Sequence, residues 1–152
     1  PVVGICEAAM QIASLLANSF SIVTTLRRSI PALEELTVKY GMSRKCQRIR
    51  AADVPVLELE NPDSEASKLI RVEIQEALDD DRSEAIVLGC AGMADLAAEL
   101  SKEFGVPVID GVSAAVKLVE SLVALRLQTS KINGYAFPRS KPYIGLFQTF
   151  QP

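Results

Sequence analysis

Three segments that are apolar at almost every position constrain the fold of this chain more than any other feature. They lie at residues 20–23, 84–88 and 106–109, and a segment of helical periodicity follows each of them. A strand that is apolar throughout, rather than at alternate positions, is typical of a parallel strand with both faces covered. Further strands are predicted at residues 2–6 and 46–51. The repeated order of strand and helix predicts βαβ units and a three-layer α/β fold, with helices on both faces of a parallel sheet.

The helices are predicted from the spacing of apolar residues and from strong helix formers. The expected ranges are 7–18, 32–41, 64–81, 92–104 and 111–127. The sequence Asn-Pro-Asp-Ser at 61–64 is expected to open the third helix. Residues 56–59 are predicted to be extended. The final segment, 129–152, combines turn residues with aromatics, and we expect a tail that packs against another surface.

Charge and cysteine content limit the partners and the compartment. The net charge of −3 argues against nucleic acid or an anionic membrane as the main partner. No apolar run approaches the roughly 20 residues that cross a bilayer, and the chain starts without the basic segment of a signal peptide. Cys6, Cys46 and Cys90 form no CxxC pair and cannot all pair with one another. A cytoplasmic, reduced protein is therefore expected.

The chain contains no histidine. This excludes the usual general base, the commonest metal ligand and every Ser-His or Cys-His catalytic scheme. Acid–base chemistry must then use a carboxylate, lysine, tyrosine or thiol. No P-loop or GxGxxG pattern occurs, so a nucleotide site has no motif to support it. We expect neither a metal nor an organic cofactor.

The strongest candidate for a reactive group is Cys90, in the turn Gly89-Cys90-Ala91-Gly92. Ligands of an open parallel sheet bind beyond the carboxyl ends of its strands, and this turn follows such a strand. A helix N-terminus there would favour a thiolate, and the amides of Ala91, Gly92 and Met93 could hold an oxyanion. Alternatively, Cys90 is a small buried hydrophobe that ends the strand. The residues alone leave both interpretations open.

Other turns at the same edge carry weaker signals. Thr24 and Thr25 end a strand, and their hydroxyls could bind a polar ligand or, more simply, cap the next turn. Arg27 and Arg28 are best explained as a solvated basic turn. Asp110 is expected to cap the helix that follows it.

Two further cysteines and an acidic run complete the candidates. Cys6 could act with Cys90 as a second base, but it runs directly into a helix without a glycine after it, so a structural role is favoured. Cys46 begins a strand, at the wrong end of the sheet for catalysis, and is interpreted as structural. The run 79–81, three aspartates, is expected to be a solvated helix end.

Two sequence motifs resemble those of a known protein family. AIVLGCAGMADL at 85–96 and GVPVIDGVSAAVKLVESL at 105–122 resemble the aspartate/glutamate/hydantoin racemase superfamily, and most of all its hydantoin and allantoin racemase branch. PVVGICEAAM and FSIVTT are similar to that branch as well. The resemblance implies two similar α/β lobes with the active site between them and one cysteine from each lobe facing the substrate carbon. Carried over by motif, Cys90 is the second-lobe cysteine.

The resemblance also implies roles for neighbouring residues. Ala91, Gly92 and Met93 would supply backbone amides to the substrate, and Thr24 and Thr25 would line the pocket. The ACFGDP-like turn with the first-lobe cysteine has no counterpart in these residues, and Cys6 is not a substitute for it.

The organisation expected from this resemblance has three parts. Residues 1–18 are the end of the first lobe and a crossover, 19–110 are a flavodoxin-like second lobe carrying Cys90, and 111–152 are a helix and tail that return toward the first lobe. The partners expected are the missing N-terminal lobe, a small-molecule cyclic ureide and further copies of the protein in a homo-oligomer.

The implied activity is cofactor-independent racemisation of a 5-substituted hydantoin-type cyclic ureide, hydantoin or allantoin, by proton transfer between two thiols. The fragment alone is expected to be inactive, because one thiol cannot serve both faces of a substrate. Two alternatives remain open at this point. One is a single-cysteine decarboxylase or isomerase of small acids, and the other is a non-catalytic flavodoxin-like module.

Overall fold

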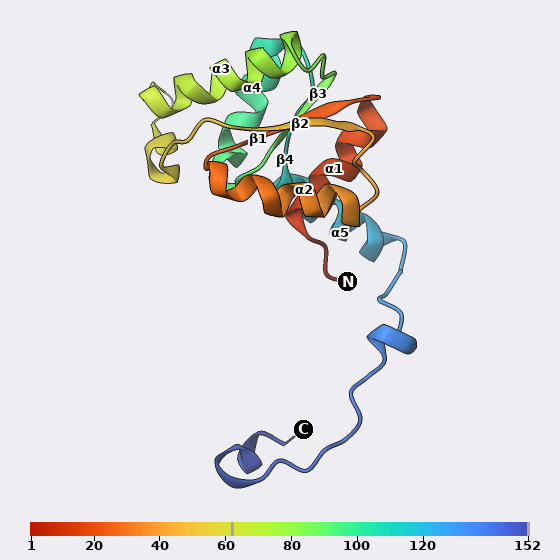
Figure 1. Cartoon of the computed structure of the whole chain (residues 1–152). Coiled ribbons are helices and arrows are strands. Elements are labelled where there is room, and N and C mark those ends of the chain that lie inside the picture. The colour runs from red at the N-terminus through yellow and green to blue at the C-terminus, as the bar shows by residue number, and fades with distance from the viewer. Residues whose placement is uncertain (62, 152) are drawn as a thin grey trace.

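A parallel four-stranded sheet forms the centre of the molecule in the computed structural model, which describes residues 1–61 and 63–151 (Figure 1). The strands, in their spatial order, are β2 (Cys46–Ala51), β1 (Phe20–Thr24), β3 (Ala85–Leu88) and β4 (Val108–Asp110). All three pairings are parallel. Every residue of β1, β3 and β4 is buried, as continuous apolar segments predict. The predicted parallel α/β fold is confirmed.

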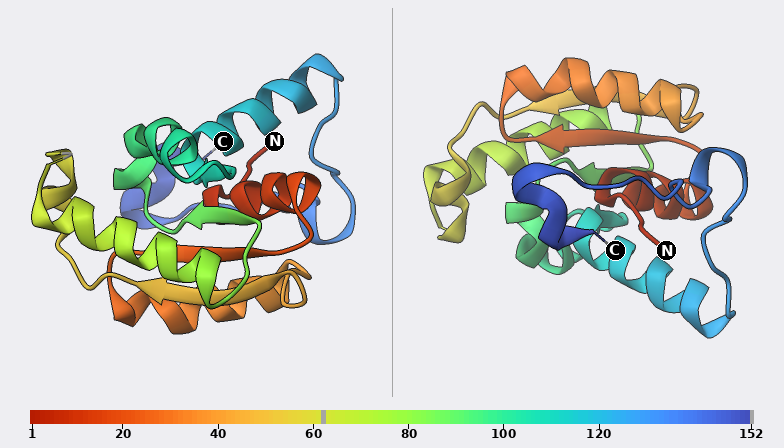
Figure 2. Two further views of the ribbon diagram at one scale, coloured as in Figure 1. Left: turned by 90° about the horizontal axis from the view of Figure 1, so that it is seen from above. Right: turned by 90° about the horizontal axis from the view of Figure 1, so that it is seen from below.

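Helices cover both faces of the sheet, which makes three layers (Figures 1 and 2). On one face lie α3 (Glu65–Asp79) and α4 (Ala97–Phe104). On the other face lie α1 (Ile5–Leu16), α2 (Ile30–Lys39) and α5 (Gly111–Ala124). Among the described residues, no helix has the length and apolar character required to cross a membrane.

Short 3-10 helices connect or follow these elements. They are η1 (Arg27–Ser29), η2 (Val56–Glu60), η3 (Ala91–Leu96), η4 (Asn133–Tyr135) and η5 (Gly145–Phe150). The expected extended segment 56–59 is therefore wrong, because these residues form the turn η2. The expected helix 92–104 is also divided, since its first part is the 3-10 helix η3 and only α4 is α-helical.

Alternate side chains of the central strands enter two separate cores. Val23 and Ile86 pack with Ile70, Ile74 and other residues on the α3 side of the sheet. Ile22, Val87 and Phe20 pack on the opposite side with the small residues of α1, which are Ala8, Ala9 and Ala13. Small side chains on that face of α1 allow its backbone to approach the sheet closely.

The predicted strand 2–6 is wrong. Residues 1–4 have no regular structure, α1 already begins at Ile5, and Val2 is 99% exposed. A strand needs a neighbouring backbone to pair with, and the described sheet gives this segment no such neighbour. The predicted helix opening at 61–64 is supported by Ser64, whose side chain accepts a hydrogen bond from the amide of Ser67 at 3.1 Å. Pro62 of that turn lies outside the described residues.

The tail beyond α5 leaves the layered part of the molecule (Figure 1). Its aromatic residues are exposed, for example Tyr135, Phe137 and Phe147. Neither core cluster of the described residues includes a member from this segment. The start of the tail, with Thr129 and Tyr135, borders a surface hollow beside α1 and α5, but no residue of the tail joins either core.

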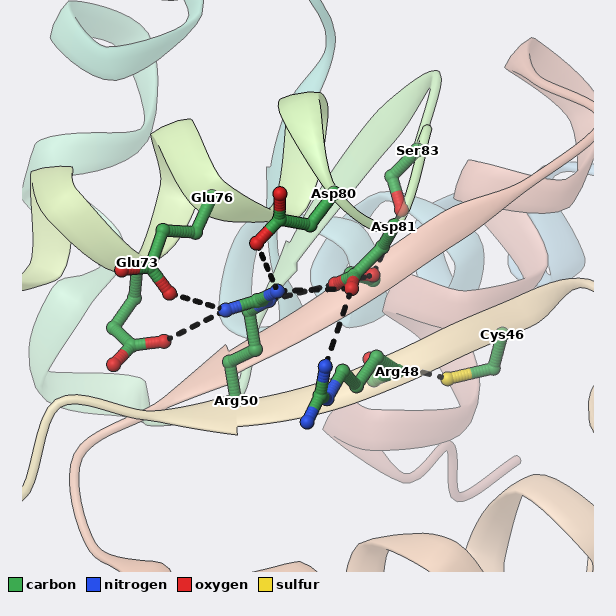
Figure 3. A network of polar contacts seen from close by, with 9 residues as sticks. Cys46, Arg48, Arg50, Glu73, Glu76, Asp80, Asp81 and Ser83 are labelled. Atoms are coloured by element: carbon green, nitrogen blue, oxygen red, sulfur yellow. Dashed lines mark hydrogen bonds and ion pairs between the residues drawn. The ribbon is translucent and has the colours of Figure 1, made fainter.

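A network of polar side chains joins the edge strand β2 to the end of α3 (Figure 3). Arg50 makes two hydrogen bonds to the carboxylate of Asp81, from Nε to Oδ2 at 2.7 Å and from Nη2 to Oδ1 at 2.9 Å. Its Nη1 also donates to Glu76 at 2.6 Å. The Arg50 and Asp81 side chains are 7% and 5% exposed. The prediction that the whole run 79–81 is solvated is thus wrong for Asp81, which is held inside by this guanidinium.

The buried pair makes the stability of the fold sensitive to acid. Burial alone would raise the pKa of Asp81, but the hydrogen bonds from Arg50 and Ser21 and the charges of Arg50 and Arg48 outweigh it and hold this pKa below its usual 3.8. The unfolded chain therefore takes up the proton at a higher pH than the folded chain does. The stabilisation is fully present above about pH 4 and is lost as the pH falls through the lowered pKa.

We expect the free energy of unfolding, measured by urea denaturation, to fall between pH 5 and pH 2 and to fall less in an Asp81→Asn variant. Asp79→Asn, which changes a carboxylate on the surface of the same helix end, is the matched control and should keep the full dependence. An equal pH dependence in the wild-type chain and Asp81→Asn would contradict this account.

Candidate functional site

Cys90 lies where β3 ends, at the carboxyl edge of the sheet. Its backbone is extended, with φ −141° and ψ 134°, and it is the residue from which η3 begins. The residue is half-buried and borders a cavity of about 70 Å³. The same cavity is bounded by Cys6 of α1, Leu33 of α2 and Gly111 of α5. The Cys90 side chain packs against the core on the α3 side of the sheet, and its sulfur lies 3.8 Å from the position of a Cβ atom on Gly92.

The backbone amides that follow Cys90 differ in their availability. The Met93 amide donates to the carbonyl of Cys90 at 3.1 Å, and the Met93 side chain is fully buried. The amides of Ala91 and Gly92 come before the first hydrogen bond of η3, so they have no acceptor within that helix. Both residues are exposed. Of the three predicted donors, Ala91 and Gly92 are thus the better placed for an oxyanion.

The two glycines of this turn allow its backbone to pack closely against neighbouring side chains. A Cβ atom on Gly89 would lie 2.8 Å from Cβ of Thr24, and one on Gly92 would lie 2.6 Å from Cγ1 of Val56. The side chains of Thr24 and Val56 occupy the space that a larger residue at either position would need.

Thr24 and Thr25 hold the adjacent strand end in place. The Thr24 hydroxyl donates to the carbonyl of Gly89 at 3.3 Å. The carbonyls of Thr24 and Thr25 accept hydrogen bonds from the amides of Ala52 and Val54. Both threonines are buried. These contacts give Thr24 a role in supporting the Cys90 turn.

The two other thiols have different surroundings. Cys6 lies in the first turn of α1 and faces the Cys90 cavity, although the sequence placed it at a strand end. Burial raises its pKa, so it is a poor base near neutral pH. Cys46 begins β2, away from this cavity, and burial together with the nearby Cys6 raises its pKa to about 12. The assignment of Cys46 as structural agrees with this environment.

We expect Cys46 to react with iodoacetamide much more slowly than an ordinary thiol, because the thiolate is the nucleophile and burial raises the pKa of Cys46 to about 12. Peptide mapping by mass spectrometry over a time course at pH 8 measures the order of modification. In denaturant, all three cysteines should react at similar rates. Fast labelling of Cys46 in the folded chain would contradict the buried environment described here.

Two helices meet beside the cavity. Asp110 caps α5 as predicted, and its Oδ1 accepts a hydrogen bond from the Ser113 amide at 2.7 Å. Gly111 follows directly, and a Cβ atom there would lie 2.6 Å from the backbone oxygen of Ile5. The sequence gives no indication of this contact, because Ile5 and Gly111 lie far apart along the chain.

Gly111→Ala is expected to destabilise the chain by about 1–3 kcal/mol, since backbone atoms at Ile5 cannot move aside as a flexible side chain would. Urea denaturation measures the change. Gly134→Ala is the matched control, because a Cβ atom there meets nothing within 4 Å, and it should be close to neutral. Equal stability of the two variants would show that α1 and α5 are not in close contact at this point.

An α/β lobe with a thiol at the carboxyl edge of its parallel sheet is the class of structure that the fold and the site define. Residues 1–119 match the Asp/Glu/hydantoin racemase family, and the chain belongs to that family. No group of three or more potential metal-binding side chains occurs in the described parts of the chain.

Two curated relatives of the chain are hydantoin racemases. The chain is 51% identical over 145 residues to a hydantoin racemase of Rhizobium meliloti and 45% identical over 150 residues to one of Pseudomonas sp. (strain NS671). These matches take in 95% and 99% of this chain, but 60% of each relative. The chain thus spans about three fifths of the length of the curated relatives it matches.

A solved structure gives the same result for the fold. Allantoin racemase from Klebsiella pneumoniae superposes with a TM-score of 0.91 at 52% identity, over 100% of this chain and 62% of that protein. The predicted relationship to hydantoin and allantoin racemases is confirmed, as is the α/β architecture of the lobe.

Proposed function

We propose that this chain is the Cys90-bearing part of an enzyme that racemises a 5-substituted hydantoin-type cyclic ureide. The observation that carries the proposal is the position of Cys90, on a cavity at the carboxyl edge of a parallel sheet. The names of the similar proteins, hydantoin racemase and allantoin racemase, supply the substrate class.

The chemistry requires a base and an acid on opposite faces of one carbon. In a hydantoin ring, C5 lies beside the C4 carbonyl, so removal of the C5 proton gives an enolate. A thiolate at Cys90 takes or returns that proton on one face, and a second thiol, supplied from outside this chain, acts on the other. The amides of Ala91 and Gly92 are proposed to stabilise the enolate oxygen. Proton transfer of this kind requires no cofactor.

A partner lobe has apolar surface available to it. The outer faces of α1 and α5 expose large aliphatic side chains, and so does the tail; they include Ile5, Leu15, Leu16, Val112, Val116, Val123 and Leu146. Apolar patches of this kind mark interaction surfaces. We propose that residues 1–18 and 111–152 contact the N-terminal lobe, that 19–110 form the second lobe, and that the complete protein is a cytoplasmic homo-oligomer.

The decisive experiment joins the chain to an N-terminal lobe from a hydantoin racemase and follows the loss of optical rotation of a single-enantiomer hydantoin. Racemisation by this completed protein, with none by the separate chain, is the expected result. Release of CO₂ from an arylmalonate-like acid, without racemisation, would instead identify a single-thiol decarboxylase. If the completed protein shows neither activity, the chain is a non-catalytic module.

A further inference from the structure

The tail beyond α5 holds one asparagine in a backbone conformation that this residue seldom adopts. Asn133 has φ 53°, whereas Gly134, which follows it, does not have a positive φ. The amide of Tyr135 donates a hydrogen bond to the carbonyl of Ile132 at 3.3 Å, so these four residues form a tight turn. A positive φ at the first central residue and not at the second is the pattern of a type II′ turn, whose first central position favours glycine.

The second turn of the tail shows the same pattern with glycine in place. The 3-10 helix η5 begins from Ile144, whose φ of −120° and ψ of 158° equal those of Ile132 before η4. The next residue there is Gly145, with φ 65°. Asn133 therefore occupies a glycine-type position, and its side chain makes this conformation strained.

The geometry of a type II′ turn brings a nucleophile close to an electrophile. In such a turn, ψ of the first central residue is about −120°. Tetrahedral geometry at Cα places Cβ about 120° from the backbone nitrogen around the Cα–C bond, so at this ψ the nitrogen of Gly134 eclipses Cβ of Asn133. This is the arrangement of a five-membered ring closed between the Gly134 nitrogen and Cγ of Asn133. Atoms held in a ring-closing geometry react faster than atoms that must first find it.

The described structure leaves this pair of residues open to reaction. Asn133 and Gly134 are both exposed, in the segment that leaves the layered part of the molecule (Figure 1). The Gly134 amide comes before the first hydrogen bond of η4, so it has no acceptor within that helix. A Cβ atom on Gly134 would meet nothing within 4 Å, so the space around the attacking nitrogen is free.

The two other asparagines of the sequence lack these features. Asn18 is followed by Ser19, whose side chain stands beside the nitrogen that would have to attack. Asn61 is followed by a proline, which has no N–H group to lose. Asn133 is thus distinguished from both by its neighbour as well as by its turn.

We propose that Asn133-Gly134 is a self-modification site, at which the chain deamidates and forms isoaspartate. The Gly134 nitrogen bonds to Cγ of Asn133, the bond from Cγ to Nδ2 breaks, and ammonia leaves with the proton of the former amide. Water then opens the cyclic imide. Attack at one carbonyl gives aspartate, and attack at the other gives isoaspartate, in which the main chain runs through one additional carbon.

The product changes both the charge and the course of the tail. Residues 129–152 contain no acidic side chain and three basic ones, Lys131, Arg139 and Lys141. The new carboxylate appears among these charges and takes the net charge of the chain from −3 to −4. The additional backbone carbon alters the direction in which the aromatic part of the tail continues from η4.

The test incubates the folded chain at pH 8 and follows the peptide that contains position 133 by mass spectrometry. Methylation by an isoaspartyl methyltransferase identifies the isoaspartate. We expect Asn133 to deamidate several-fold faster than the same asparagine in a synthetic peptide of residues 128–139, because the turn holds the reacting atoms together. Asn18 should remain intact in the same sample, and isoelectric focusing should show one new, more acidic band.

Gly134→Ala is the discriminating variant. The added methyl group hinders the attacking nitrogen but meets no other atom within 4 Å, so deamidation should slow by an order of magnitude or more while the free energy of unfolding stays the same. Asn133→Gly, which copies the turn at Gly145, should give no acidic band. A rate in the folded chain at or below that of the peptide, or an unchanged rate in Gly134→Ala, would overturn this inference. Each of these readouts is independent of racemase activity.

Discussion

Cys90→Ser is expected to lower kcat/KM of the completed protein by about 10²–10⁴-fold for racemisation in either direction. The hydroxyl is close in size to the thiol but does not ionise near neutral pH, so it cannot take the C5 proton. Because the Cys90 side chain is only half-buried and makes no hydrogen bond among the described residues, the fold should tolerate the change. Polarimetry measures racemisation, and proton NMR in D₂O measures exchange at C5.

Two comparisons make this result specific to the site. Cys46→Ser removes a thiol that does not border the Cys90 cavity and should retain most of the activity. Urea denaturation of Cys90→Ser should give a free energy of unfolding within about 1 kcal/mol of the wild-type value. Undiminished racemisation by a well-folded Cys90→Ser protein would show that this thiol is not a catalytic group.

Arg50→Met is expected to destabilise the chain by about 3–5 kcal/mol. Arg50 supplies two hydrogen bonds to the buried Asp81 carboxylate and Ser21 a third, so its removal would leave that charge inside the protein with the Ser21 hydroxyl but without its cationic hydrogen-bond partner. Methionine retains much of the aliphatic volume, so the loss reports the charge rather than a cavity. The free energy of unfolding from urea denaturation at pH 7 measures it.

Arg48 provides the matched control for this prediction. It reaches the same Asp81 carboxylate at 3.8 Å, but its side chain is 64% exposed. Arg48→Met should therefore cost less than about 1 kcal/mol, as exposed ion pairs do. Equal losses from Arg48→Met and Arg50→Met would show that burial of Arg50 does not determine the strength of the network.

The layered fold could be predicted because its main signal is local. Each buried parallel strand must be apolar on two faces, and segments such as Ala85–Leu88 have that composition with a helix on either side. The same reasoning failed at residues 2–6, which have the composition of a strand but find no neighbour in the described sheet. Strand composition alone cannot show that a partner backbone is present.

The candidate site was predictable only in part. A cysteine between glycines at the end of a strand identified Cys90, and the structure places it on a cavity. The cavity wall could not be predicted, because Cys6, Leu33 and Gly111 come from three different helices. The pairing of Arg50 with Asp81 could not be predicted either. The two residues are 31 positions apart, and nothing in the sequence indicates that their side chains are buried.

The close fit of the Cys90 turn has a practical consequence for redesign. Thr24 packs against Gly89 on one side and Val56 packs against Gly92 on the other, so neither glycine can carry a side chain without moving its neighbour. Mutant libraries that aim to change substrate range should leave these two glycines fixed. Diversity placed at Leu33 and Cys6 would reshape the cavity next to this turn, while the backbone that carries the Cys90 thiol keeps its position.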